Sequence, residues 1–352
     1  MSRYLAMLLF LTACSSESFE PWEIDDLDDA QGFSLRVPEF EVPSGRESQN
    51  CYFVTVPDLA NGADVWVDRI LTAMNPGSHH MNVFRVKTIE NLDPAAGVPV
   101  TLGKYDGTLI EGSDEYATNP CWDSANWSDW PLVANSQHAT IESPLTEWKL
   151  PEDVAIRLTP GERLMVQTHY VNSTDQPTKW GAKVGINFYR QAESKTPVEL
   201  GSLFATQQNI RICRSAPKVT YSGTCKFPND VTITAANGHF HKRGQQFSIF
   251  PWSGTSTQHP DPATLMYQSN DWSHPPMATD IGVVAPANTG IWWDCAYQWS
   301  PPSDTTCDAI DDKDPSANKD CCYTFGGNTD VGEHCNVFLY YYPKVDTDIF
   351  CL

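Results

Sequence analysis

From residue 34 onward, hydrophobic and polar residues alternate or form short β-branched runs, and helical periodicity is scarce. Pro, Gly, Asn and Asp bound these runs, and the chain contains 26 prolines and 21 glycines. Many short strands separated by turns are typical of all-β folds, whereas βαβ folds alternate strands with amphipathic helices. The clearest predicted strands cover residues 51–56, 64–70, 79–86, 162–171, 183–189, 232–241, 291–297 and 336–342.

A polar stretch at residues 191–197 is the best boundary between domains. It divides the chain into two segments, 34–191 and 192–352, each of an ordinary domain size. We therefore predict two consecutive antiparallel β-sandwich domains, jelly-roll-like in form. An acidic segment at 304–320 is predicted to be a solvated loop, with a calcium site as the alternative, although its Asp spacing fits no EF-hand.

The first fourteen residues predict export. Arg3 precedes a short apolar run at residues 5–11, which is too short to span a bilayer and is typical of a signal peptide. Residues 11–14, Leu-Thr-Ala-Cys, resemble a bacterial lipobox, in which Cys14 would be lipidated and become the mature N-terminus. Because Ser15 follows Cys14, the resemblance favours an outer-membrane anchor, facing the periplasm or the cell surface.

The remainder should be soluble and tethered, since no later stretch approaches 18 apolar residues. Residues 15–33 are rich in acids and are predicted to be a solvated spacer between lipid and domain. The whole chain carries 23 basic and 44 acidic residues, a formal charge of −21, which argues against nucleic acid as a partner. Without Cys14, ten cysteines remain in an oxidising compartment, so disulfides are expected.

Histidines carry the candidate chemistry. Only nine occur, yet five fall in short motifs, which are His79-His80, Gln167-Thr168-His169 and His239-Phe240-His241. Residues i and i+2 of a strand share a face, so His239 and His241 can bind one ion together. His79 and His80 would point to opposite faces unless the strand bulges there or the two rings bind through different nitrogens.

This pattern favours metal binding over surface or packed histidines, the simpler interpretation for isolated cases such as His138, His259 and His274. Imidazole ligation suits copper, zinc or iron, and copper has the highest affinity for nitrogen sites. Common catalytic motifs such as G-x-G-x-x-G, G-x-S-x-G and H-E-x-x-H are absent from the sequence.

At these residues the sequence resembles the copper type II, ascorbate-dependent monooxygenases, the family of peptidylglycine α-hydroxylating and dopamine β-monooxygenases. The resemblance covers nearly all of residues 38–352. It is carried by four segments in the family's order, which are 42–51, the His-His-Met at 79–81, Gln-Thr-His-Tyr-Val-Asn at 167–172 and His-Phe-His at 239–241, together with the last strand, Glu-His-Cys-Asn-Val-Phe-Leu-Tyr-Tyr at 333–341.

The resemblance implies two β-sandwiches, each with one copper ion, facing each other across a solvent-filled cleft. His79, His80 and His169 would hold the electron-transfer copper, and His239, His241 and His334 the oxygen-binding copper. It also implies a disulfide between Cys295 and Cys335 and another between Cys51 and Cys121. A long-range disulfide from Cys351 to Cys213 or Cys225 is a further expectation.

Two positions depart from the family. His334 stands where the family has a Met ligand, and a third imidazole stabilises Cu(II) better than a thioether does. The alternative is that His334 is a bystander and that Met277 supplies the ligand. Asn237 and Phe338 replace the Arg and Tyr of peptide-amidating members, so we do not expect peptide amidation.

The sequence thus predicts a copper monooxygenase that uses O2 and ascorbate, or another one-electron reductant, to hydroxylate a C–H bond of a small organic substrate. Because His334 replaces the Met, the alternative is a copper-binding or redox lipoprotein on the same scaffold that does not hydroxylate. A purely structural lipoprotein is the third hypothesis.

Overall fold

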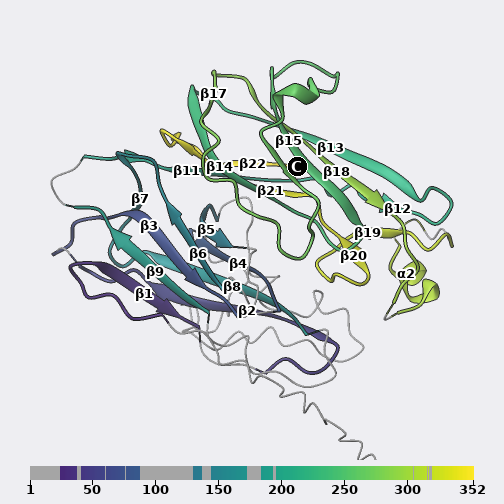
Figure 1. Cartoon of the computed structure of the whole chain (residues 1–352), viewed down its shortest axis with the longest axis horizontal. Coiled ribbons are helices and arrows are strands. Elements are labelled where there is room, and N and C mark those ends of the chain that lie inside the picture. Colours follow the sequence, from purple (N-terminus) through teal and green to yellow (C-terminus); the bar gives the residue numbers. More distant parts are fainter. Residues whose placement is uncertain are drawn as a thin grey trace, which may run out of the picture.

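The computed structural model describes residues 24–37, 41–59, 61–75, 77–87, 130–136, 144–172, 184–192, 196–303, 305–314, 316 and 319–352. Two β-rich halves lie side by side, the N-terminal half in purple to teal and the C-terminal half in green to yellow (Figure 1). The predicted all-β sandwich class is confirmed. No helix in the described ranges has the length and hydropathy to cross a bilayer.

The N-terminal half contains two sheets. One has the order β1-β9-β3-β7-β10, with β6 also paired to β3, and the other has the order β2-β8-β4-β5. The strands of the first sheet are β1 (Gly32–Arg36), β3 (Val65–Ala73), β6 (Leu145–Lys149), β7 (Val154–Leu158), β9 (Gly185–Arg190) and β10 (Val198–Glu199). The strands of the second sheet are β2 (Arg46–Thr55), β4 (Ser78–Arg85), β5 (Leu132–Ser136) and β8 (Arg163–Asn172).

The C-terminal half contains a five-stranded sheet, β17-β14-β21-β11-β22, facing a four-stranded sheet, β13-β18-β15-β16, with a small sheet, β12-β19-β20, beside them. The five-stranded sheet comprises β11 (Gly201–Thr206), β14 (Val231–His239), β17 (Val283–Ala285), β21 (Asn336–Tyr342) and β22 (Ile349–Cys351). The other strands are β12 (Arg211–Ile212), β13 (Lys218–Lys226), β15 (Gly244–Trp252), β16 (Tyr267–Ser269), β18 (Gly290–Gln298), β19 (Tyr323–Phe325) and β20 (Gly332–Glu333).

The outer face of the five-stranded sheet closes the gap between the halves. Ala235, Phe338 and Tyr340 belong to the hydrophobic core of the N-terminal half, although they lie on β14 and β21. The Trp148 and Tyr340 ring centroids are 4.6 Å apart. Asn135 of β5 accepts a hydrogen bond from the Tyr340 hydroxyl and donates one to Asn237. Burial of this apolar surface holds the two halves together.

Two expected boundaries differ from the structure. The predicted spacer was to be solvated through residue 33, but Gly32 and Phe33 belong to β1, and the Phe33 ring stacks on Phe188 at 4.9 Å. An apolar side chain at the end of an acidic run therefore joins the core. The second domain was expected from residue 192, whereas β10 still pairs with β7, and the C-terminal half begins with β11 at Gly201.

Four disulfides brace the C-terminal half. Cys295–Cys335 joins β18 to the start of β21, as expected, and Cys225–Cys351 confirms the expected long-range bridge. The others are Cys213–Cys322 and Cys307–Cys321, and the expected Cys51–Cys121 bridge lies outside the described residues. Four disulfides indicate a protein that folds in an oxidising compartment outside the cytoplasm. Cys14 and the rest of the signal also lie outside the described residues.

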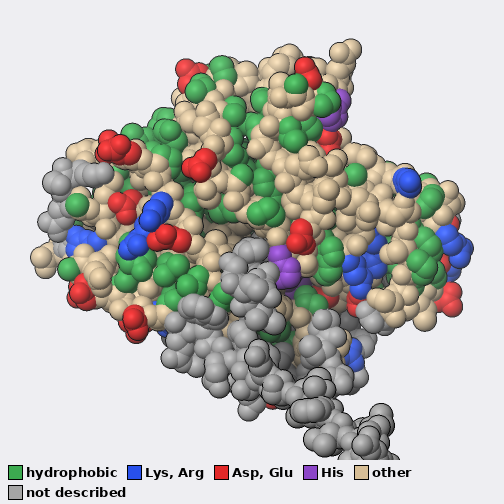
Figure 2. Space-filling view, in the orientation of Figure 1, with side chains coloured by type: hydrophobic (Ala, Val, Ile, Leu, Met, Phe, Trp, Pro, Cys, Tyr) green, Lys and Arg blue, Asp and Glu red, His purple; other side chains and the backbone are tan. Residues whose placement is uncertain are grey.

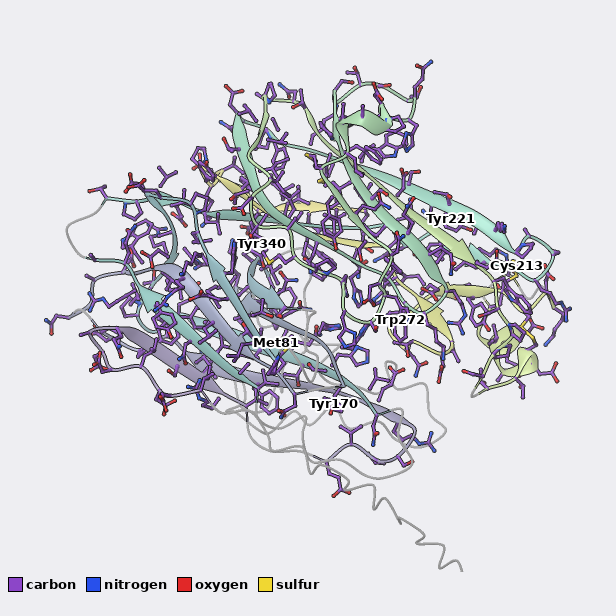
Figure 3. All side chains as sticks on the ribbon, viewed as in Figure 1. Met81, Tyr170, Cys213, Tyr221, Trp272 and Tyr340 are labelled. Carbon is purple, nitrogen blue, oxygen red and sulfur yellow. A yellow bond between two sulfur atoms is a disulfide. The ribbon has the colours of Figure 1, made fainter. Side chains whose placement is uncertain are left out.

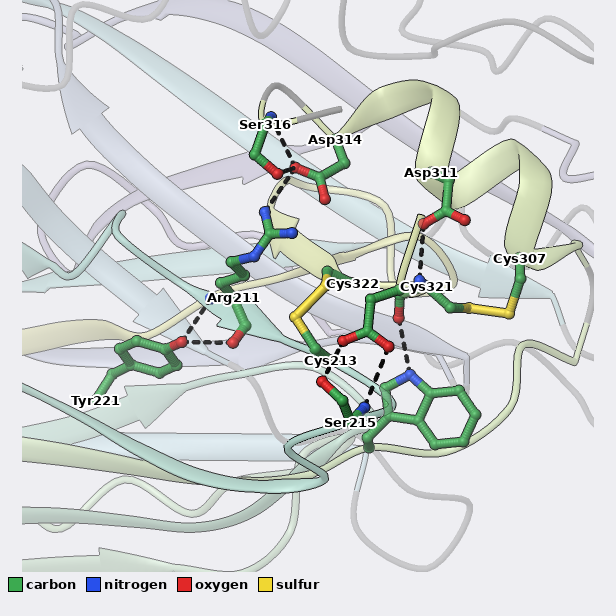
Figure 4. The surroundings of a disulfide bond; sticks show 12 residues. Arg211, Cys213, Ser215, Tyr221, Cys307, Asp311, Asp314, Ser316, Cys321 and Cys322 are labelled. Atoms are coloured by element: carbon green, nitrogen blue, oxygen red, sulfur yellow. Dashed lines mark hydrogen bonds and ion pairs between the residues drawn. A yellow bond between two sulfur atoms is a disulfide. The ribbon is translucent and has the colours of Figure 1, made fainter. Parts of the chain in front are cut away.

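Helix α2 (Cys307–Lys313) occupies part of the acidic segment expected to be a solvated loop (Figure 4). The Asp314 carboxylate accepts a hydrogen bond from Arg211 at 2.7 Å, and the Asp311 carboxylate accepts one from the Cys321 amide. Both carboxylates are buried, and their hydrogen bonds fix the helix to its neighbours. Because the two carboxylates are engaged in these contacts, they do not support the alternative of a calcium site.

Candidate metal centre

All six sequence-predicted histidine ligands meet where the two halves touch, in the region of Trp272 in Figure 3. The N-terminal half contributes three from neighbouring strands, and the C-terminal half contributes three from the end of β14 and the segment before β21. Their side chains are nearly inaccessible, and the largest exposed fraction is 6%. The six residues are His79, His80, His169, His239, His241 and His334.

A bulge in β4 brings the two adjacent histidines together. Ser78 pairs with Tyr170 and His80 pairs with His169, so the register between β4 and β8 shifts by one residue at His79. An extra residue of this kind turns its side chain out of the regular alternation. The Nε2 of His79 and the Nδ1 of His80 are both buried without a hydrogen bond. The bulge expected from the sequence is therefore present, and the two rings offer different nitrogens.

The two histidine groups form one cluster. The ring centroid of His79 lies 5.0 Å from that of His169 and 4.8 Å from that of His239. One set of potential ligand atoms within 4.8 Å of one another belongs to His79, His80 and His169, and a second belongs to His79, His239 and His241. His79 is thus common to both sets.

In the part of the chain that the structure describes, the expected solvent-filled cleft does not separate the two groups, because the His79 and His239 ring centroids are 4.8 Å apart. The apolar contact made by Ala235, Phe338 and Tyr340 closes the halves onto each other, which brings the strand ends that carry the histidines together. His334 lies in the same cluster, with its ring centroid 4.5 Å from that of His241. Met277, the alternative ligand, packs against the N-terminal hydrophobic core.

Hydrogen bonds assign the tautomers of three rings. His241 Nδ1 lies 3.1 Å from the Gly332 carbonyl, which can only accept, so Nδ1 carries the proton and Nε2 keeps a lone pair. His169 Nε2 lies 2.9 Å from the Glu47 carboxylate, which leaves Nδ1 for a ligand bond. His80 Nε2 lies 3.3 Å from the Gln167 amide oxygen. Such partners orient imidazole ligands and raise their basicity.

Burial favours the neutral form of five of the six histidines. Desolvation lowers the pKa of His79 well below 6.5, and the neighbouring imidazoles, His169 first, lower it further. The pKa values of His80, His239, His241 and His334 are also lowered well below 6.5, mainly by burial. Deprotonated imidazole is the form that binds metals, so no proton has to leave these rings at neutral pH.

Two buried acids that the sequence did not single out position the ligands. The Glu333 carboxylate accepts hydrogen bonds from the His241 and Arg243 backbone amides, both at 3.0 Å, and forms an ion pair with the Arg243 guanidinium at 3.3 Å. Desolvation raises the pKa of Glu333 to about 7, and Arg243 opposes that shift. Glu47 accepts a hydrogen bond from the Thr329 amide as well as contacting His169, and so links the two halves.

Little in the sequence indicates that these two acids lie beside the ligands. Glu47 is in the segment that resembles the family's first strand, and Glu333 directly precedes His334. Their positions beside the ligands depend on β2 pairing with β8 and on the loop at residues 327–331 reaching the N-terminal half.

A pocket of about 60 Å³ adjoins the cluster. His80, His169, His239 and His334 line one end, and the remaining walls are aromatic, amide and hydroxyl groups. Phe338, which stands where the family has Tyr, is part of this lining, with its ring centroid 6.4 Å from that of His239. Asn237, which stands where the family has Arg, contacts Asn135 between the halves.

The donor set fits a nitrogen-seeking metal ion. In addition to the His79 and His80 nitrogens, His241 Nε2 is buried without a hydrogen bond. Leaving a buried polar atom unsatisfied costs about 1–3 kcal/mol, so several together in one cluster call for a partner. Three imidazoles converging from two neighbouring segments of the chain's fold suit copper or zinc.

The chain was compared with known proteins. No protein-family model matches it, and no curated protein is similar to it. Two solved structures are similar over much of their length. The PBSX exported protein XepA is 9% identical, with 84% of this chain and 100% of that chain covered and a TM-score of 0.22. A putative secreted protein from Eubacterium rectale is 8% identical, with 86% and 71% covered and a TM-score of 0.19. Likenesses at this level carry no argument about function.

Proposed function

We propose that the chain is an exported copper monooxygenase that hydroxylates a C–H bond of a small organic substrate with O2 and an external one-electron reductant such as ascorbate. The observation that carries the proposal is the buried cluster of six histidines beside an aromatic pocket. Histidine sets of this kind in the family that the sequence resembles hold two copper ions. In the proposal, Cys14 anchors the mature protein to the outer membrane.

The protein's own residues would hold the copper ions, orient the imidazole ligands and exclude water from the site. His79, His80 and His169 would hold one copper ion, and His239, His241 and His334 the other, with His79 close enough to serve both groups. When bound, copper supplies one-electron redox chemistry and a site for oxygen. Glu47 and the carbonyl of Gly332 keep the protonated nitrogens of His169 and His241 turned away from the metal.

The surroundings limit access of water. The ring centroids of Phe325 and His334 are 4.8 Å apart, and those of Trp272 and His79 are 5.8 Å apart. On the face seen in Figure 2, apolar side chains lie along the recess between the halves, and lysines and arginines are interspersed with acids. Such surroundings fit a small, uncharged reaction chamber better than a surface for a charged polymer.

The proposal is tested by copper binding and oxygen uptake. The purified protein, loaded with copper and supplied with ascorbate and candidate substrates, should consume oxygen with substrate, whereas His241→Ala should not. His259→Ala is the matched control, because His259 lies outside the cluster and contacts Asp294. No oxygen uptake beyond that of free copper would refute the oxygenase proposal.

A second function has one observation in its favour. All six candidate donors are imidazoles. His334 stands where the family has a Met thioether, and this change favours Cu(II) over Cu(I). A copper-binding redox protein would bind copper tightly and cycle reversibly without oxygen uptake. His334→Met should then create oxygenase activity, whereas in a working monooxygenase it should only alter the rate.

A further inference from the structure

The pocket beside the histidine cluster has an ordered apolar wall. Phe338, Phe204 and Phe350 are paired across three neighbouring strands, β21, β11 and β22. Their rings stack, with centroids 5.2 Å apart for the first pair and 5.7 Å for the second, at interplanar angles of 30° and 26°. A flat, apolar group could stack against this row in the same offset manner.

A polar row follows on the same sheet face. Thr206 pairs with Asn336, two residues along from the Phe204–Phe338 pair, and Asn336 in turn pairs with His239. Residues i and i+2 share a face, so a hydroxyl and an amide lie between the phenylalanines and the histidines. Gln208, which is exposed, adds a second amide to the rim.

Charge is missing from the lining. None of the described residues around the pocket is an Asp, Glu, Lys or Arg, and the lining comprises His80, Asn82, Gln167, His169, Phe204, Thr206, Gln208, His239, Phe325, Gly327, His334, Asn336, Phe338 and Phe350. A carboxylate or ammonium bound there would lose water without gaining a partner of opposite charge. A metal ion bound at the histidines would not compensate a charge at the far end of a substrate, because the reacting carbon, and not the charged end, faces the metal.

We propose that the pocket selects neutral substrates with a flat apolar group, stacked on Phe204, Phe338 and Phe350, and one hydrogen-bonding group near Thr206 and Asn336. The inference rests on the proposed function, since it takes this pocket to be the substrate site. The volume of about 60 Å³ is smaller than a phenyl ring needs, so only a small reacting end fits among the histidines, and the ring stacks toward half-buried Phe350.

Three probes of one shape test the selection: phenylacetamide, phenylacetate and phenethylammonium. Their binding to the metal-free protein is measured by calorimetry at pH 7.5. Phenylacetamide should bind at least about tenfold more tightly than either ion, because each ion loses its hydration without compensation. Phe204→Ala should weaken phenylacetamide by about three- to tenfold, in line with the contribution of aromatic pairs, and Trp252→Ala, outside the pocket, should not.

A second variant tests the inference independently, in case Phe204→Ala does not fold. Gln208→Arg adds a cation to an exposed position on the rim, so it should raise the affinity for phenylacetate several-fold and leave that for phenylacetamide unchanged. Equal or tighter binding of either ion to the unaltered protein would overturn the inference, and so would no binding of any probe. The binding assay needs neither copper nor turnover. Binding of the neutral probe without oxygen uptake in the copper-loaded protein would therefore refute only the proposed oxygenase. Oxygen uptake with charged substrates alone would refute only the proposed selectivity for neutral substrates.

Discussion

His79 has a special place in the cluster, and removing it is the most informative perturbation. Its ligand atom lies within 4.8 Å of those of His80 and His169 and also of those of His239 and His241. His169→Ala takes one ligand from the first set and leaves the second complete. His79→Ala leaves only two imidazoles in each of these sets. Among the described residues, His334 does not join His239 and His241 in a set within 4.8 Å, so if the closed cluster is the arrangement that binds copper, His334 does not replace His79 and copper binding should be impaired throughout the cluster.

The size of the effect follows from ligand loss. Loss of a partner that merely orients a ligand costs about 10–100-fold in metal affinity, so loss of a ligand should cost at least about 100-fold, or 2.7 kcal/mol per ion. An ion present at 100 times its dissociation constant stabilises the fold by about 2.7 kcal/mol. For a domain of this size that is a rise of about 5–10 °C in the unfolding temperature per ion.

The assay combines copper content after dialysis with thermal unfolding in the presence and absence of copper. The unaltered protein and His259→Ala should show the full copper-induced rise in unfolding temperature, His169→Ala about half, and His79→Ala almost none. If His79→Ala retains as much copper as His169→Ala, His79 is not shared between the sets. His334 would then complete the second set in place of His79, and the arrangement of the rings in the closed cluster would not be the one that binds metal.

Three further predictions concern other contacts. Glu47→Gln should weaken copper binding by about tenfold through loss of the carboxylate that orients His169, measured by competition with a chelator. Asp314→Asn should cost about 1 kcal/mol at pH 7, since Arg211 lowers the pKa of Asp314 to about 2 and the guanidinium is partly exposed. A lowered carboxyl pKa stabilises the fold above pH 4 and loses this effect as pH falls toward 2, so urea unfolding should show the difference about halved at pH 3 and unchanged between pH 5 and 7. His334→Met should raise the copper reduction potential, because a thioether favours Cu(I), and an unchanged potential would show that position 334 does not bind the metal.

Local patterns predicted much of the fold and the histidine set. Alternating residues identified the strands, and the His79-His80 pair indicated either a bulge or binding through different nitrogens, of which the structure contains the bulge. The disulfides Cys295–Cys335 and Cys225–Cys351 were also among the expectations. The strands and the bulge depend on short-range geometry, whereas the disulfides join residues 40 and 126 apart in the sequence, and the Cys295–Cys335 pairing was expected from the family resemblance alone.

The closure of the two histidine groups into one cluster could not be predicted in this way. It depends on Ala235, Phe338 and Tyr340 packing on a core built from the N-terminal half, and alternation within a strand does not reveal which surface covers its outer face. The role of Glu47 was missed for the same reason, because its contacts, to His169 and Thr329, are 122 and 282 residues distant.

The supports behind the histidines divide into two kinds, and the difference bears on how the site could work. Behind His241 and His334, the buried Glu333–Arg243 pair and the Cys295–Cys335 disulfide hold the ligands to one half of the protein. Behind His169, Glu47 also contacts Thr329 of the other half. Opening the two halves would leave the Glu333–Arg243 and Glu47–His169 contacts intact but would break the hydrogen bond from Thr329 to Glu47. Any motion that separates the histidine groups therefore changes the hydrogen bonding of Glu47, the acid that orients His169, and this makes Glu47 the contact through which the position of the halves can affect the metal centre.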